Sequence, residues 1–140
     1  MDSPGSYKAL LVDDERFLLS IYSTVFMKHG FDVYACTSAA DGIASIRHGF
    51  APDVILFDIT MPETSGYEFL ENLRDVALPC DCLKLALTNE GQDAEISRTL
   101  KLGADAHIIK AGYTAHELVT LVREMIETRK GFKAPSVSAN

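Results

Sequence analysis

Apolar and polar positions alternate along this chain in two different periods. Short and mostly apolar runs, such as "YKALLVD" from Tyr7 to Asp13, are followed by longer stretches in which apolar residues recur every three or four positions, as between Glu15 and His29. The first pattern is typical of a buried strand and the second of an amphipathic helix. The chain is therefore predicted to consist of repeated strand and helix units.

Five such units are predicted. The strands are expected at Tyr7–Asp13, Phe31–Cys36, Asp53–Asp58, Cys82–Thr88 and Ala106–Lys110. The helices are expected at Glu15–His29, from an N-cap at Thr37–Ser38 to His48, and at Thr64–Asp75, Gln92–Leu102 and Ala115–Lys130. The third strand, "DVILFD", is apolar throughout, as a strand covered on both faces should be. This order predicts a doubly wound α/β fold, with a parallel sheet between two helix layers and right-handed crossovers.

Glycines at the ends of the predicted helices fit these boundaries. Gly30, Gly49 and Gly103 follow predicted helices, where a residue that tolerates positive φ is favoured. With 140 residues and 47% hydrophobic content, the chain fits one domain, expected at residues 7–130 between an N-terminal extension (1–6) and a flexible C-terminal tail (131–140).

Composition excludes several classes of function. Thirteen Lys and Arg against twenty Asp and Glu give a net charge of -7, which disfavours direct binding to nucleic acid. Neither a signal peptide nor an apolar run of membrane-spanning length is apparent, so we expect a cytoplasmic protein that does not enter a membrane. Three cysteines without paired CxxC motifs support neither a disulfide framework nor a structural zinc site.

The ends of the predicted strands carry the candidate chemistry. The first strand ends in Asp13 and Asp14, the third in Asp58, the fourth in Thr88 and the fifth in Lys110. Ligands of open α/β sheets gather at the carboxyl ends of the strands, so these side chains are expected to converge. Three carboxylates repel one another unless a cation neutralises them, and Mg²⁺ is the hard cation that suits oxygen ligands. An ionised Asp58 beside such a metal can attack phosphorus, which predicts phosphoryl transfer onto Asp58.

Four segments together resemble a known family. "LLVDDE", "ILFDITMPETSGYEFL", "LALTNE" and "HIIKA" are similar, in order and spacing, to the receiver domain of bacterial two-component response regulators, over residues 7 to about 129. The resemblance is to the single-domain kind that includes chemotaxis regulators. It implies a flavodoxin-like topology with strand order 2-1-3-4-5.

The resemblance also implies roles for individual residues. Asp58 would accept a phosphoryl group from a phosphohistidine on a sensor histidine kinase or a histidine phosphotransfer protein. Asp14, Asp58 and the backbone carbonyl of Thr60 would bind Mg²⁺ directly, and Asp13 would act mainly through water. Thr88 and Lys110 would contact the phosphoryl oxygens. Such a protein catalyses only its own phosphorylation and dephosphorylation, and is not otherwise an enzyme.

The chain departs from the family pattern at three positions. His107 stands where the family usually has an aromatic residue that moves with the threonine, here Thr88; we hypothesise that His107 partly replaces this switch and titrates near neutral pH, the alternative being an inert surface residue. Ala111 replaces a proline joined by a cis bond, so a trans bond or a rearranged loop is expected. Asn89 replaces a small residue.

Residues beside the acceptor are expected to tune the reaction and shape the loop. Thr60, Asn89 and Glu90 flank the site and are predicted to alter the rate of autodephosphorylation. In "MPETSG", Thr64 or Ser65 is expected to cap the next helix, and Gly66 to allow close approach of the backbone, while Met61 serves packing.

Alternatives from other classes remain open at this point. Because ten residues follow Lys130, we expect a stand-alone regulator that binds a downstream protein or relays phosphate, rather than a receiver cut from a longer protein; a homodimer is compatible with either. A receiver-like interaction module that is not phosphorylated is the main rival. A metal-dependent phosphatase with an aspartate nucleophile is less favoured, because such enzymes commonly carry a second aspartate where this chain has Thr60. An FMN-binding protein of the same topology would need a phosphate-binding loop after the first strand, and "VDDERF" there would repel a phosphate.

Overall fold

Five parallel strands form one sheet in the order β2-β1-β3-β4-β5, which confirms the predicted topology. The computed structural model describes residues 6–89 and 92–131. The strands are β1 (Lys8–Val12), β2 (Asp32–Cys36), β3 (Val54–Asp58), β4 (Leu83–Thr88) and β5 (Ala106–Ile109). The helices are α1 (Arg16–Lys28), α2 (Ala39–Arg47), α3 (Gly66–Leu73), α4 (Asp93–Lys101) and α5 (Ala115–Gly131).

The predicted elements all occur, with ends shifted by one or two residues. One element was not predicted: a short 3-10 helix, η1 (Lys110–Gly112), begins at the residue expected to end the fifth strand. All peptide bonds among the described residues are trans, so the Lys110–Ala111 bond follows the trans alternative. Residues 1–5 and 132–140, which make up most of the predicted extension and tail, lie outside the described residues.

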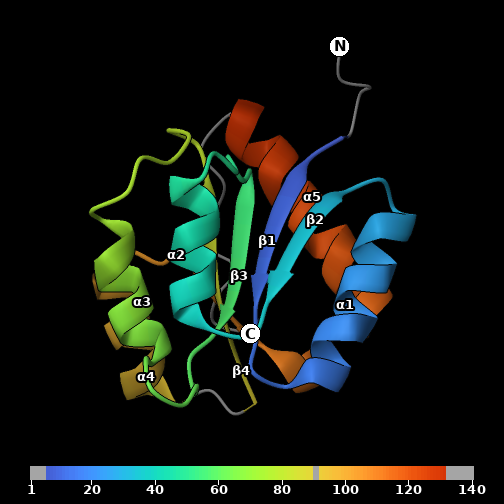
Figure 1. Ribbon diagram of the computed structural model, residues 1–140. Coiled ribbons are helices and arrows are strands. Elements are labelled where there is room, and N and C mark those ends of the chain that lie inside the picture. Colours follow the sequence, from blue (N-terminus) through green and yellow to red (C-terminus); the bar gives the residue numbers. More distant parts are fainter. Residues whose placement is uncertain (1–5, 90–91, 132–140) are drawn as a thin grey trace.

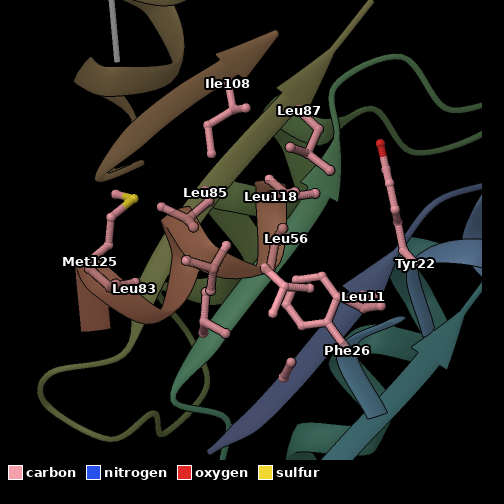
Figure 2. Packing of buried hydrophobic residues seen from close by; sticks show 14 of the residues in the cluster. Leu11, Tyr22, Phe26, Leu56, Leu83, Leu85, Leu87, Ile108, Leu118 and Met125 are labelled. Atoms are coloured by element: carbon pink, nitrogen blue, oxygen red, sulfur yellow. The ribbon is translucent and has the colours of Figure 1, made fainter. Parts of the chain in front are cut away.

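Helices cover both faces of the sheet (Figure 1). On one face α1 and α5 pack over an apolar cluster that includes Leu11, Leu56 and Phe26 (Figure 2). On the other face α2 and α3 cover a second cluster built around Ile55 and Phe57. Successive residues of a strand point to opposite faces, so the alternate side chains of β3 enter both clusters and all five of its residues are buried. This strand is the central support of the site at its carboxyl end.

Helix boundaries follow the local signals in the sequence. Ser38 accepts a hydrogen bond from the backbone N–H of Asp41 and caps α2. Ser65, rather than Thr64, caps α3 in a reciprocal capping box with Glu68. The three glycines predicted to close helices have positive φ, namely Gly30 (90°), Gly49 (111°) and Gly103 (117°). Among the described residues, no helix combines the length and the apolar character that crossing a membrane requires.

Candidate functional site

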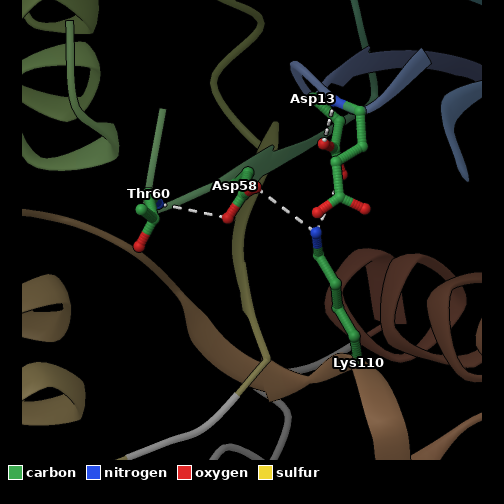
Figure 3. A network of polar contacts seen from close by, with 5 residues as sticks. Asp13, Asp58, Thr60 and Lys110 are labelled. Atoms are coloured by element: carbon green, nitrogen blue, oxygen red, sulfur yellow. Dashed lines mark hydrogen bonds and ion pairs between the residues drawn. The ribbon is translucent and has the colours of Figure 1, made fainter. Parts of the chain in front are cut away.

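Two neighbouring strands bring the first pair of carboxylates together. Val12 of β1 lies beside Phe57 of β3, so the residues that follow them, Asp13 directly after β1 and Asp58 at the end of β3, emerge at the same edge of the sheet. Both are buried, with exposed fractions of 2% and 5%. The Nζ of Lys110, the first residue of η1, donates to Asp13 Oδ2 at 2.9 Å and to Asp58 Oδ2 at 3.3 Å (Figure 3). The ammonium group therefore bridges two carboxylates that would otherwise repel each other.

A third carboxylate completes an acidic cluster. Oxygen atoms of Asp13, Asp14 and Asp58 lie within 4.8 Å of one another. Asp14 is half-buried, whereas the other two aspartates are buried. One ammonium group leaves an excess of negative charge among three carboxylates, and oxygen atoms are the ligands that Mg²⁺ prefers. The residues present thus fit the magnesium site that the resemblance implies.

Burial governs the electrostatics of Asp58. The pKa of Asp58 is raised above its usual value chiefly because burial penalises the charged form, with a further contribution from the charge of Asp13. The charge of Lys110 and the backbone N–H of Thr60, which donates to Asp58 Oδ1 at 3.1 Å, oppose this rise. For Lys110 burial lowers the pKa, but the hydrogen bond to Asp13 and the charge of Asp58 outweigh burial, so its pKa is raised and the side chain stays positive.

A hollow of about 340 Å³ lies beside Asp58. The residues that line it are Asp58, Thr60, Thr88, Asn89, Gln92 and Glu95. The structure therefore brings Thr88 and two of the predicted tuning residues, Thr60 and Asn89, close to Asp58. Glu90, the third, lies outside the described residues.

Sequence reasoning missed two residues of this hollow. Gln92 and Glu95 belong to the N-cap and first turn of α4. This helix is the next element after β4, whose carboxyl end carries Thr88. That position in the chain could have predicted that the first turn of α4 lies near the site.

The loop after β3 packs closely against the backbone of Asp58. A Cβ atom placed on Gly66 would lie 2.7 Å from the carbonyl oxygen of Asp58 and 2.7 Å from the Cα of Ile59, and the Gly66 N–H donates to the Ile59 carbonyl at 2.8 Å. The predicted close approach at Gly66 is confirmed. Met61 is buried in the cluster beneath α2 and α3, which confirms its packing role.

His107 is not a surface residue. Its side chain is 1% exposed, and its Nδ1 lies 3.2 Å from the hydroxyl of Thr99 on α4. Burial lowers the pKa of His107 below the usual 6.5, which the charge of Glu95 only partly opposes. The inert surface alternative is therefore wrong. Desolvation favours the uncharged ring and moves the titration of His107 from its usual range toward acid pH.

Known proteins share both the sequence pattern and the fold. The family model of the response regulator receiver domain matches residues 9–123. Response regulator SaeR of Staphylococcus epidermidis is 31% identical over 117 residues, which cover 84% of this chain and 49% of that protein. SaeR of Staphylococcus aureus is 29% identical over 123 residues, which cover 88% of this chain and 52% of SaeR. The chain thus spans about half the length of the curated relatives it matches.

Solved structures agree with this assignment. A CheY-like response regulator receiver domain protein from Methanospirillum hungatei matches with a TM-score of 0.77 and 26% identity, covering 90% of this chain and 98% of its own. A receiver domain protein from Clostridium thermocellum has the same fold, with a TM-score of 0.76 at 24% identity and coverage of 89% and 97%. The chain therefore belongs to the response regulator receiver domain family.

Proposed function

We propose that this domain is the phosphoacceptor of a two-component phosphorelay and that Asp58 accepts the phosphoryl group. The donor is a phosphohistidine on a sensor histidine kinase or on a histidine phosphotransfer protein. The observation that carries the proposal is the convergence of Asp58, Lys110 and two further aspartates at the carboxyl end of a buried strand. This convergence supplies a nucleophile, a fixed positive charge and a set of metal ligands.

The reaction exchanges one bond to phosphorus for another. A carboxylate oxygen of Asp58 attacks phosphorus, the P–N bond to the imidazole breaks, and the departing nitrogen keeps the electron pair. The magnesium ion, when bound, offsets negative charge on the phosphoryl oxygens. Lys110, already in contact with Asp58, supplies a second positive charge to those oxygens. The hydroxyl of Thr88 lines the same hollow and can donate to them.

The hydrogen bonds of Asp13 and Asp58 differ in length, which supports different roles in the metal site. Asp13 accepts from Lys110 through Oδ2 and from the backbone N–H of Glu15 through Oδ1, both at 2.9 Å. Asp58 accepts from Lys110 at 3.3 Å and from the backbone N–H of Thr60 at 3.1 Å. The shorter bonds at Asp13 favour contact with the metal through water, and Asp14 and Asp58, with the carbonyl of Thr60, would be the direct ligands.

The output of this domain is a change in protein binding. Phosphorylation alters the affinity for a downstream protein in the cytoplasm, and a second copy of the chain is one such partner. The net charge of -7 favours protein partners over direct contact with nucleic acid. The domain transforms only itself, by gaining and losing the phosphoryl group, and turns over no other substrate.

Phosphorylation can be tested with the isolated chain. Incubation with Mg²⁺ and a small phosphodonor, such as acetyl phosphate, should add the mass of one phosphoryl group. Asp58→Asn should abolish this gain. Asp32→Asn, at the exposed start of β2 and the opposite end of the sheet, should leave it intact.

Two results would contradict the proposal. An unmodified wild-type chain would favour the interaction module that is not regulated by phosphorylation. Steady release of phosphate from phosphoesters, at a rate far above the decay of the modified chain, would favour the phosphatase.

A further inference from the structure

Two histidine side chains meet on the surface between α1 and α5. His29 is the C-cap residue of α1, and His116 lies in the first turn of α5. The Nε2 atom of His29 and the Nδ1 atom of His116 are 3.1 Å apart, and the two ring planes stand at 76° to each other. Both side chains are exposed, and 87 positions separate them in the sequence. The fold, rather than the local sequence, therefore brings two imidazole nitrogens together.

The contact between the neutral rings is a hydrogen bond. One of the two facing nitrogens carries a proton, and the other accepts it. Such a bond between exposed groups contributes little to stability, because water can replace either partner. The fold therefore gains little from this pairing itself.

The same distance suits two ligands of one metal ion. Metal–nitrogen bonds of about 2.0–2.1 Å that meet at a tetrahedral or a right angle place the two nitrogens about 2.8–3.4 Å apart. The separation of 3.1 Å lies within this range. Imidazole is a ligand of Zn²⁺, Ni²⁺ and Cu²⁺, whereas Mg²⁺ prefers oxygen. A transition metal ion can therefore replace the proton between the rings.

Neighbouring contacts hold the two rings in position. The guanidinium group of Arg123 on α5 donates to the backbone carbonyl of His29 and lies 5.1 Å from the centre of the Phe31 ring. The two helices also pack on the apolar cluster of Figure 2, which includes Phe26 of α1. A site that is assembled before binding loses little entropy when the ligand arrives. The positive charge of Arg123 opposes a cation, so the affinity is moderate rather than tight.

We propose that His29 and His116 form a binding site for a divalent transition metal ion, such as Zn²⁺ or Ni²⁺, and that the bound ion links α1 to α5. Each ring binds through its facing nitrogen and keeps one proton on the other nitrogen. The proton of the hydrogen bond moves to that far nitrogen through solvent, so no proton is released in net. Water fills the remaining coordination positions. The site shares no residue with the acidic cluster of Asp13, Asp14 and Asp58, and it does not depend on the proposed phosphorylation.

Melting temperatures with Zn²⁺ or Ni²⁺ test this site. Excess Mg²⁺ competes for the carboxylates, a Cys80→Ser background removes the exposed thiol, and a pH of about 8 keeps free imidazole neutral. The metal should raise the melting temperature, and a chelator should reverse the rise. His29→Ala and His116→Ala should each weaken binding roughly a hundredfold, because the second ring binds as an intramolecular ligand. His48→Ala, at the exposed C-cap of α2, is the matched control and should respond as the parent does.

Imidazole ¹⁵N signals identify the atoms that bind. One Zn²⁺ ion per chain should shift the signals of His29 Nε2 and His116 Nδ1 together and leave those of His48 in place. Circular dichroism without metal should show that both alanine variants are folded, because they remove only exposed side chains.

Two results would overturn the proposal. If neither the melting temperature nor the signals of His29 and His116 respond to Zn²⁺ or Ni²⁺, the pair is only a hydrogen bond. If the response persists in both alanine variants and disappears in Asp58→Asn, the metal binds at the acidic cluster instead. Neither result bears on the phosphorylation of Asp58, which intact mass measures separately.

Discussion

The ring of His107 links the stability of the protein to pH. Burial lowers the pKa of His107 from its usual 6.5 in the fold, so the unfolded chain takes up the proton first as pH falls. Stability is therefore lost below about pH 6.5, where the unfolded state binds more protons than the fold. We expect the melting temperature of the wild type to fall more steeply between about pH 7 and 5 than that of His107→Phe, whose ring cannot titrate. Parallel melting curves would contradict this assignment.

Asp58 has the opposite effect on stability. Burial and the charge of Asp13 raise the pKa of Asp58 above 3.8 in the fold, against the pull of Lys110. The ionised carboxylate therefore costs stability, and that cost appears as pH rises from 3.8 through the raised pKa. Without metal at neutral pH, Asp58→Asn should raise the melting temperature by about 4 °C, the equivalent of about 1 kcal/mol. The gain should shrink toward acid pH, and Asp32→Asn should show none.

At the level of elements, the loop between β3 and α3 depends on one glycine. A Cβ atom on Gly66 would overlap the backbone of Asp58 and Ile59, at 2.7 Å from each. Gly66→Ala should therefore destabilise the protein by roughly 1–3 kcal/mol, as overpacking does, and should slow the proposed phosphorylation because it displaces Asp58. Gly112→Ala is the matched control, since a Cβ atom there would meet nothing within 4 Å. Urea denaturation and the rate of mass gain measure the two effects, and equal behaviour of both variants would contradict the proposed role.

The elements predicted from sequence are those that depend on periodicity. The third strand, for example, could be predicted because β3 is buried on both faces and therefore forms an unbroken apolar run in the sequence. The acidic cluster follows from the rule that parallel strands end at one edge. The bond between His107 and Thr99 could not be predicted, because it joins β5 to α4 through a side-chain orientation that spacing does not encode. Glu95 was missed for the same reason, since its place in the hollow depends on how α4 docks.

At the scale of the whole molecule, the site lies between two elements that differ in packing. Asp58 ends β3 and Asp13 follows β1, and the side chains of both strands enter the apolar clusters on both faces of the sheet. Across the hollow stands α4, in which Thr99 is the one buried residue. If Asp58 is phosphorylated as proposed, the added charge would face a deeply packed strand on one side and a less deeply packed helix on the other.

The charge balance of the whole site gives a last prediction, on Lys110. This ammonium group neutralises part of the charge of Asp13 and Asp58, and it also repels a bound cation. Lys110→Ala should therefore bind Mg²⁺ several-fold more tightly than the wild type does. A given concentration of Mg²⁺ should then raise the melting temperature of this variant more than that of the wild type. The same variant should accept the phosphoryl group poorly, because it lacks the positive charge that faces the phosphoryl oxygens. Asp14→Asn should lose both the stabilisation by metal and the phosphorylation.

Melting curves over a range of Mg²⁺ concentrations, paired with intact mass after exposure to acetyl phosphate, separate the two functions of this charge. Lys84→Ala is the matched control, because Lys84 lies on β4 and pairs with Asp105 at 3.9 Å, away from the acidic cluster. It should leave both metal binding and phosphorylation unchanged. Weaker magnesium binding in Lys110→Ala would mean that Lys110 holds the carboxylates in place for the metal, and that its positioning of Asp13 and Asp58 outweighs its repulsion of the cation.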